Sequence, residues 1–82
     1  MITAFAMNWN VQRSRVEVYA RNDEGSFVGQ ANNVEQLVKL IKRHGVIHDI
    51  RDIRPIWRDL YRNDLCLVFD KMVEDALTEA SA

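Results

Sequence analysis

The residues of this chain that could do chemistry are few, and their spacing favours structural roles. His44 and His48 are four positions apart, the spacing at which two imidazoles on one helical face bind zinc. Gly45 lies between them and is expected to end the helix, so the two rings would not share a face. Cys66 is flanked by leucines and is expected to pack in the core. We therefore predict neither a metal site nor a cysteine nucleophile.

Two pairs of neighbouring acids also fail to predict an acid–base site. Asp23 and Glu24 fall in an expected turn, where carboxylates are solvated. Glu74 and Asp75 fall on an expected helix face with the same consequence. A catalytic pair needs a pocket that makes one carboxyl an acid and the other a base. The sequence also contains no glycine-rich phosphate loop and no serine nucleophile elbow, so we expect a non-enzymatic protein without a cofactor.

Arginines and one tyrosine gather around an expected hairpin and form the first candidate binding site: Arg13, Arg15, Tyr19 and Arg21. Cations and flat rings on one sheet surface can stack nucleobases or dock a protein. Trp9, one strand away, could join this surface, but we interpret it as a core residue beside Phe5 and Met7. Tyr19 lies on the side of the arginines and is expected to be exposed.

A second set of arginines recurs every four positions and forms the second candidate site: Arg54, Arg58 and Arg62. On a helix this spacing places them on one face, and Arg51 stands just before them. Asp52 and Asp59 lie close enough in sequence to form surface ion pairs, each contributing about 0 to 1 kcal/mol. The alternative to a binding site is therefore a solvated helix face.

Alternation of apolar and polar residues predicts an antiparallel meander in residues 1–30. The stretch from Thr3 to Val11 alternates with a period of two, and so does the stretch from Arg15 to Arg21. In the second stretch one side is apolar, and the other, which includes Glu17, is expected to be solvated. Residues 22–25 end in glycine and predict a turn, after which residues 27–30 return as a short third strand.

Helical spacing begins after Asn33, which is a good N-cap with Gln36 at the reciprocal position of a capping box. The apolar stripe of this helix consists of Val34, Leu37, Val38 and Ile41. Its last turn is cationic, as the helix dipole favours: Lys42, Arg43 and His44. Gly45 is expected to end it.

The rest of the chain predicts a brief extended segment, residues 46–50, and then one or two further helices. Asp52 can cap a helix with Pro55 in its first turn. The residues expected to share a face of this helix are Ile53, Trp57, Leu60 and Tyr61. One helix from residue 53 to residue 78 would be about 39 Å long, so we favour a break near Asn63. The run from Leu65 to Phe69 is apolar on every side, so the last helix should be buried or should self-associate.

Length and composition predict one domain spanning residues 1–82. The alternation and the helical spacing make it an α+β domain, with a sheet of about three strands followed by two or three helices packed on it in residues 33–82. A chain of 82 residues that is 48% hydrophobic and 28% charged is expected to fold. A net charge of −1 gives no global attraction to nucleic acid or to an anionic membrane. The lone cysteine, the missing signal-peptide pattern and the absence of a long apolar run indicate a cytoplasmic protein that does not enter a membrane.

The segments RVEVY and GSFVGQANNVEQLVKLIKRHG resemble the strand, hairpin and helix of a small phage anti-CRISPR family that binds the Cascade complex of a type I system. The resemblance covers residues 15–45, and the exposed strand tyrosine of that family corresponds to Tyr19. The family has an additional hairpin before its helix, for which this chain has no room. The resemblance implies an inhibitor that blocks a nucleic-acid-binding surface of a bacterial effector complex. The same element order is similar to the arm-binding domains of tyrosine integrases and to the plant AP2 domain, whose sheets enter the DNA major groove.

We therefore expect a protein-binding module, a small phage or mobile-element inhibitor of a host protein or protein–nucleic-acid complex. One alternative is a nucleic-acid binder that uses the hairpin face, although a pI of about 6.1 argues against it. The other alternative is a homodimeric accessory subunit joined through the C-terminal helix.

Overall fold

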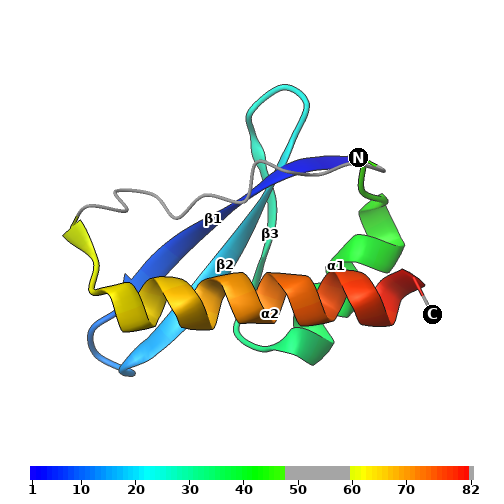
Figure 1. The fold of residues 1–82 in the computed structure, drawn as a ribbon. Helices are drawn as coiled ribbons and strands as arrows, with labels where there is room; N and C mark the ends of the chain where they lie inside the picture. Colours follow the sequence, from blue (N-terminus) through cyan, green and yellow to red (C-terminus); the bar gives the residue numbers. More distant parts are fainter. Residues whose placement is uncertain (48–59, 82) are drawn as a thin grey trace.

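The computed structural model describes residues 1–47 and 60–81, which form an α+β fold of three antiparallel strands and two helices (Figure 1). The strands are β1 (Ile2–Asn10), β2 (Arg15–Asn22) and β3 (Phe27–Ala31), and they lie in the order β1-β2-β3. The helices are α1 (Val34–His44) and α2 (Asn63–Ser81). In Figure 1 the long helix α2 crosses the sheet in front of the strands, and α1 lies beside its C-terminal half.

Strand β1 ends one residue earlier than the alternation predicts. Val11 was expected to complete the strand, but it is exposed in the turn of residues 11–14. The side chain of Asn10 accepts a hydrogen bond of 3.0 Å from the backbone N–H of Arg13, which bends the chain away from the sheet. Ser14 completes the turn with a φ of 49°.

The turn between β2 and β3 forms where it was predicted and is organised by Asn22. Its side-chain oxygen accepts hydrogen bonds from the backbone N–H groups of Glu24 and Ser26, both at 3.0 Å. Gly25 adopts a φ of 82°, a conformation that glycine tolerates without steric cost. The third strand then extends one residue beyond the prediction, to Ala31.

Helix α1 confirms Asn33 and Gly45 as its caps, whereas the reciprocal bond of Gln36 goes to the residue before the N-cap. The side chain of Asn33 accepts a hydrogen bond from the N–H of Gln36 at 2.9 Å, and Gln36 in turn accepts one from the N–H of Asn32 at 2.8 Å. At the other end Gly45 has a φ of 74° and donates its N–H to the carbonyl of Ile41. These local bonds satisfy backbone groups that a helix end leaves without intrahelical partners.

The predicted break near Asn63 is confirmed, because α2 begins at that residue. Leu60 was expected to share a buried face with Tyr61, yet Leu60 is exposed and only Tyr61 packs against the core. The expected helix from Asp52, including Pro55, lies outside the described residues, as do Ile53, Trp57, His48 and residues 48–50 of the expected extended segment.

The apolar run at the start of α2 is divided between core and solvent, which corrects the expectation of burial on every side. Leu65, Cys66 and Phe69 are buried, as predicted for the cysteine, whereas Leu67 and Val68 are exposed at 59% and 48%. Helix α2 packs on the sheet and against α1, so the residues on its remaining side face water.

One hydrophobic core joins the sheet to both helices. Its largest fully buried side chains are Ile2, Phe5, Met7, Val18, Leu37, Cys66, Phe69 and Val73. At Gly29 of β3 helix α1 comes so close that an added Cβ would lie 2.5 Å from a methyl carbon of Leu40. Neither described helix is long and apolar enough to span a membrane.

Candidate binding face

Strand β2 directs four alternate side chains to the side of the sheet that faces away from the helices: Arg15, Glu17, Tyr19 and Arg21. Val16, Val18 and Ala20 occupy the opposite side and are buried in the core, as predicted. Cross-strand pairing adds Asn8 of β1 next to Glu17, and Gln30 and Phe27 of β3 next to Tyr19 and Arg21. We call these seven residues the outer sheet face: Asn8, Arg15, Glu17, Tyr19, Arg21, Phe27 and Gln30.

One end of the outer sheet face is an aromatic and cationic cluster. The Cζ atom of Arg21 lies 4.6 Å from the centroid of the Phe27 ring, within the range of a cation–π contact. The rings of Tyr19 and Phe27 are 5.1 Å apart between centroids and tilted by 60°. Tyr19 was expected to be exposed but is half-buried because Phe27 packs on it, while Phe27 itself is 52% exposed.

Arg21 enters no ion pair with any of the described residues, although it is only half-buried. Its Nε atom is shielded from solvent and has no hydrogen-bond partner there. The guanidinium is therefore held against an exposed ring with its charge uncompensated, an arrangement that suits an incoming carboxylate.

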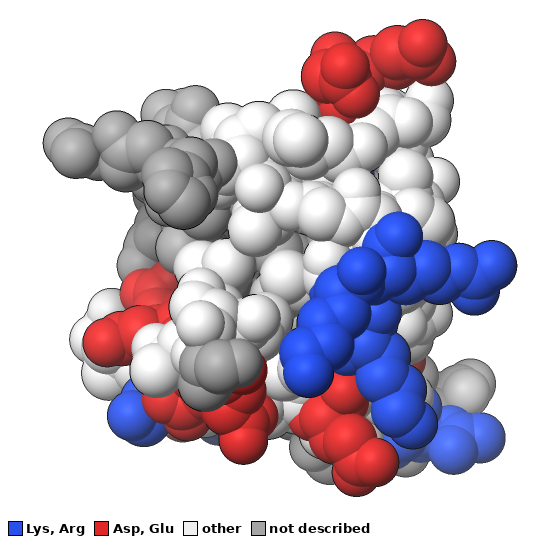
Figure 2. All heavy atoms as spheres, turned by 90° about the vertical axis from the view of Figure 1, so that its right-hand side faces the viewer, with Lys and Arg blue, Asp and Glu red and all other residues white. Residues whose placement is uncertain are grey.

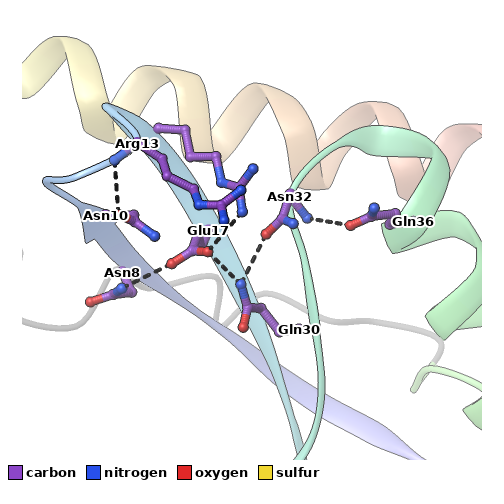
Figure 3. A network of polar contacts seen from close by, with 8 residues as sticks. Asn8, Asn10, Arg13, Glu17, Gln30, Asn32 and Gln36 are labelled. Carbon is purple, nitrogen blue, oxygen red and sulfur yellow. Dashed lines mark hydrogen bonds and ion pairs between the residues drawn. The ribbon is translucent and has the colours of Figure 1, made fainter.

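The other end of the outer sheet face is a polar cluster around Glu17, which was expected to be solvated but is 5% exposed (Figure 3). Its carboxylate accepts hydrogen bonds from the side-chain amides of Asn8 at 3.3 Å and Gln30 at 2.5 Å. The Nη2 atom of Arg15 lies 3.5 Å from the same carboxylate. A buried charge is tolerable only when it is paired and hydrogen-bonded, and these neighbours supply both conditions.

The polar cluster continues from the sheet to the start of α1. The side-chain amide of Gln30 lies 2.9 Å from that of Asn32, and the backbone of Asn32 bonds to Gln36 (Figure 3). One orientation of the Asn32 amide also places its oxygen 3.1 Å from the Nη2 atom of Arg15. The cap of α1 thus shares its residues with the network that positions Glu17 and Arg15.

Of the remaining members of the two predicted sites, the structure describes Arg13 and Arg62. Arg13 is exposed in the turn of residues 11–14, next to the Arg15 end of β2. Trp9 pairs with Val16 and packs against the core on the helix side, so it does not join the outer sheet face. Arg62 precedes α2, is exposed and forms an ion pair of 3.3 Å with Asp64. Arg54 and Arg58 lie outside the described residues.

Sequence reasoning missed Phe27 as a member of this face, and it placed Glu17 on the correct side of β2 but expected it to be solvated instead of buried. The position of Phe27 could be found only from strand pairing, because Phe27 follows the glycine turn and lies directly opposite Arg21. A β-bulge between Ala20 and Arg21 shifts that register, so residue counting alone would not have aligned the two side chains.

Charged groups elsewhere are solvated or locally paired. Figure 2 looks at the side of the molecule where α1 lies and shows most of its visible Lys and Arg side chains in one group, with acidic groups above and below it. On α1, Lys39 pairs with Glu35 at 3.7 Å, and Lys42 and Arg43 are exposed near the negative end of the helix dipole. The turn acids Asp23 and Glu24 are fully at the surface.

An ion pair on helix α2 changes the pKa of Lys71. A hydrogen bond from Lys71 to Asp75, at 3.1 Å, raises the pKa of the lysine above its ordinary value of 10.5, and the charges of Asp75 and Glu74 add to the effect. Within residues 1–47 and 60–81, no group of His, Cys, Asp and Glu side chains could hold a metal ion.

No protein-family model, curated protein or solved structure matches this chain. The outer sheet face itself, with its unpaired arginine and exposed ring, is therefore the basis for assigning a function.

Proposed function

We propose that this protein is a non-enzymatic binding module that docks through its outer sheet face onto a carboxylate-bearing surface of a host protein complex and inhibits it. Such a role suits a small protein of a phage or another mobile element that acts in the cytoplasm. The partner-binding residues on β2 and the preceding turn are Arg13, Arg15, Tyr19 and Arg21, and Phe27 joins them from β3.

The observation that carries this proposal is the cluster of Arg21, Tyr19 and Phe27. Tryptophan, tyrosine and arginine are enriched at the energetic centres of protein interfaces, where they combine a large contact area with hydrogen-bonding groups. Here the guanidinium already rests on the ring at 4.6 Å, so little conformational freedom remains to be lost on binding.

Charge supports a partner that presents acidic groups. Arg13 and Arg21 form no ion pair within the described residues, whereas Arg15 is compensated by Glu17. The outer sheet face together with Arg13 therefore carries an excess of positive charge. The resemblance of residues 15–45 to the anti-CRISPR family supports inhibition of an effector complex as the biological outcome.

Nucleic acid is the second candidate partner, and exposed Phe27 is the observation that favours it. An aromatic ring on a strand can stack a nucleobase, at about 1 to 3 kcal/mol per base. Against this, Asp23 and Glu24 directly follow the arginine end of β2 and would repel a phosphate backbone. The protein partner is therefore the favoured reading.

The test is affinity capture from bacterial lysate with quantitative mass spectrometry, performed in parallel on the native protein and three variants. Tyr19→Ala and Arg21→Glu should each release the captured complex, with a loss of affinity of at least about fivefold. Arg43→Ala removes an exposed arginine of α1, outside the outer sheet face, and should retain it. A complex that survives both face variants would refute the proposal.

A second experiment, on nucleic-acid binding, distinguishes the protein partner from the nucleic-acid partner. The purified protein is titrated with single-stranded and duplex DNA and RNA at low and physiological salt. Binding by counterion release would fall steeply with salt and would be abolished by Arg21→Glu. Tight binding at physiological salt would replace the protein-docking proposal, and no binding at low salt would support it.

A further inference from the structure

Helix α2 leaves an apolar strip on the side that faces away from the sheet. Leu67 and Val68 are its exposed members, and Met72 lies beside them half-buried. They line a shallow hollow of about 520 Å³ together with Lys71 and Asp75. An exposed apolar patch bordered by charges on a small protein is typical of an interaction surface.

The strip reaches beyond the helix. A second hollow, of about 340 Å³, shares Val68 and Met72 with the first. It is further lined by apolar Trp9, Val16 and Leu65 and by polar Ser14, Arg15 and Asn32. The two hollows are therefore neighbours, and the apolar surface extends from α2 to the helix side of β1. This surface lies on the opposite side of the sheet from Arg21 and Phe27.

We propose that this surface is the interface of a twofold-symmetric homodimer in which two α2 helices pack antiparallel. The charges along the strip support a second copy as the occupant. Asp64 and Lys71 lie seven residues apart, two helical turns, with Leu67 and Val68 midway between them. An antiparallel copy centred between Leu67 and Val68 brings Asp64 of each helix opposite Lys71 of the other.

The placement of the two charges favours an antiparallel orientation of the helices and a second copy of the chain as the partner. Antiparallel packing forms two equivalent Asp64–Lys71 contacts around a central Leu67–Val68 contact, as an isologous interface requires. Parallel packing would instead oppose Asp64 to Asp64 and Lys71 to Lys71. Like charges in that position are destabilising, so the strip disfavours the parallel dimer.

The ion pairs within one copy do not prevent Asp64 and Lys71 from pairing with the other copy. Asp64 pairs with Arg62 at 3.3 Å and Lys71 with Asp75 at 3.1 Å, and all four side chains are substantially exposed. Exposed pairs are weak and adopt several geometries, so both residues can turn toward a partner helix. Retained pairs would form a larger network across the interface.

The size of the surface predicts a weak dimer. Helix α2 has 19 residues and is about 28 Å long, so a single helix contact falls short of the roughly 800 Å² per partner of a standard interface. Trp9 and Met72 enlarge the contact without changing this conclusion. We expect a dissociation constant in the micromolar range.

The dimer goes beyond the proposed function and does not depend on it. Because α2 covers one side of the sheet, a dimer through α2 leaves the Arg21 and Phe27 end of each outer sheet face open, whereas Arg15 borders the second hollow (Figure 1). Two docking faces on one particle would bind a partner with repeated sites more tightly than a single face does.

The decisive experiment is sedimentation velocity over a wide concentration range on charge-swapped variants. The native protein should pass from its monomer mass of 9.6 kDa to twice that mass as concentration rises. Asp64→Lys and Lys71→Glu should each weaken the dimer by about tenfold, because each reversal creates two like-charge contacts. The double variant Asp64→Lys/Lys71→Glu restores opposite charges and should recover the native dissociation constant.

Lys39→Glu is the matched control, since Lys39 is also an exposed helical lysine paired with an acid four residues away. It should leave self-association unchanged. Thermal melts of each variant check that the fold persists. A monomer at every concentration, single reversals without effect, or a double variant that fails to recover would each overturn the proposal.

Discussion

The guanidinium of Arg21 lies over the ring of Phe27, with its central carbon 4.6 Å from the ring centroid. The two residues are separated in sequence by the five residues that contain the turn between β2 and β3. The contact exists because β2 and β3 pair Arg21 with Phe27 directly across the strands. This contact holds the cation of Arg21 in place on an exposed aromatic ring. The proposed docking function depends on this arrangement.

The first prediction measures that contact. Arg21→Ala, Phe27→Ala and the double variant form a double-mutant cycle in urea denaturation. The coupling free energy should be about 0.5 to 1 kcal/mol, as expected for an exposed cation–π pair. Additive losses within error would mean that the two groups do not interact in solution.

The second prediction concerns the buried carboxylate. Glu17→Ala should lower the free energy of unfolding by about 1 to 3 kcal/mol, because it leaves the amides of Asn8 and Gln30 without their acceptor. Glu24→Ala, at an exposed turn position, is the control and should change stability by less than about 0.5 kcal/mol. Equal effects of the two substitutions would contradict the polar cluster described for Glu17.

The third prediction tests the face that α1 presents to the core. Leu37→Ala removes a fully buried side chain and should cost about 2 to 5 kcal/mol in chemical denaturation. Leu67→Ala removes the same atoms from an exposed position of α2. At concentrations where the protein is monomeric, Leu67→Ala should change the free energy of unfolding only slightly. A loss as large as that of Leu37→Ala would mean that the buried side of a helix has been assigned wrongly.

The fourth prediction uses the close approach of α1 to β3. Gly29→Ala places a Cβ 2.5 Å from a methyl carbon of half-buried Leu40, so the Leu40 side chain must turn aside, at a cost of about 1 kcal/mol or less in the free energy of unfolding. Leu40→Ala should relieve the clash, so the double variant should lose less stability than the two single losses combined. Strict additivity would show that Leu40 is not the obstacle.

The fifth prediction is a pH dependence. Because the hydrogen bond to Asp75 raises the folded-state pKa of Lys71 above 10.5, the pair stabilises the fold below pH 10.5 and this contribution disappears as pH rises through the higher folded-state value. NMR titration of the Lys71 side chain should give a pKa above 10.5 in the native protein. In Asp75→Asn the same pKa should fall, and an unchanged pKa would exclude Asp75 as its cause.

The sequence by itself determined the features that depend on neighbouring residues. Asn33 and Gly45 mark the two ends of α1 because capping bonds span only a few residues. Gly25 marks the hairpin because its backbone conformation favours glycine, and Asn63, a weak helix former at the expected break, is the first residue of α2. The period of two in β1 and β2 likewise identified the strands.

Only the tertiary structure decided which side chains meet and which are covered. The burial of Glu17 and the stacking of Arg21 on Phe27 depend on the register of paired strands, including a bulge that no local pattern reveals. The exposure of Leu67 and Val68 depends on which side of α2 rests on the sheet. Local bonds set where each element begins and ends, whereas contacts between residues distant in sequence create the binding surfaces, because burial is a property of the packed molecule and not of any single segment.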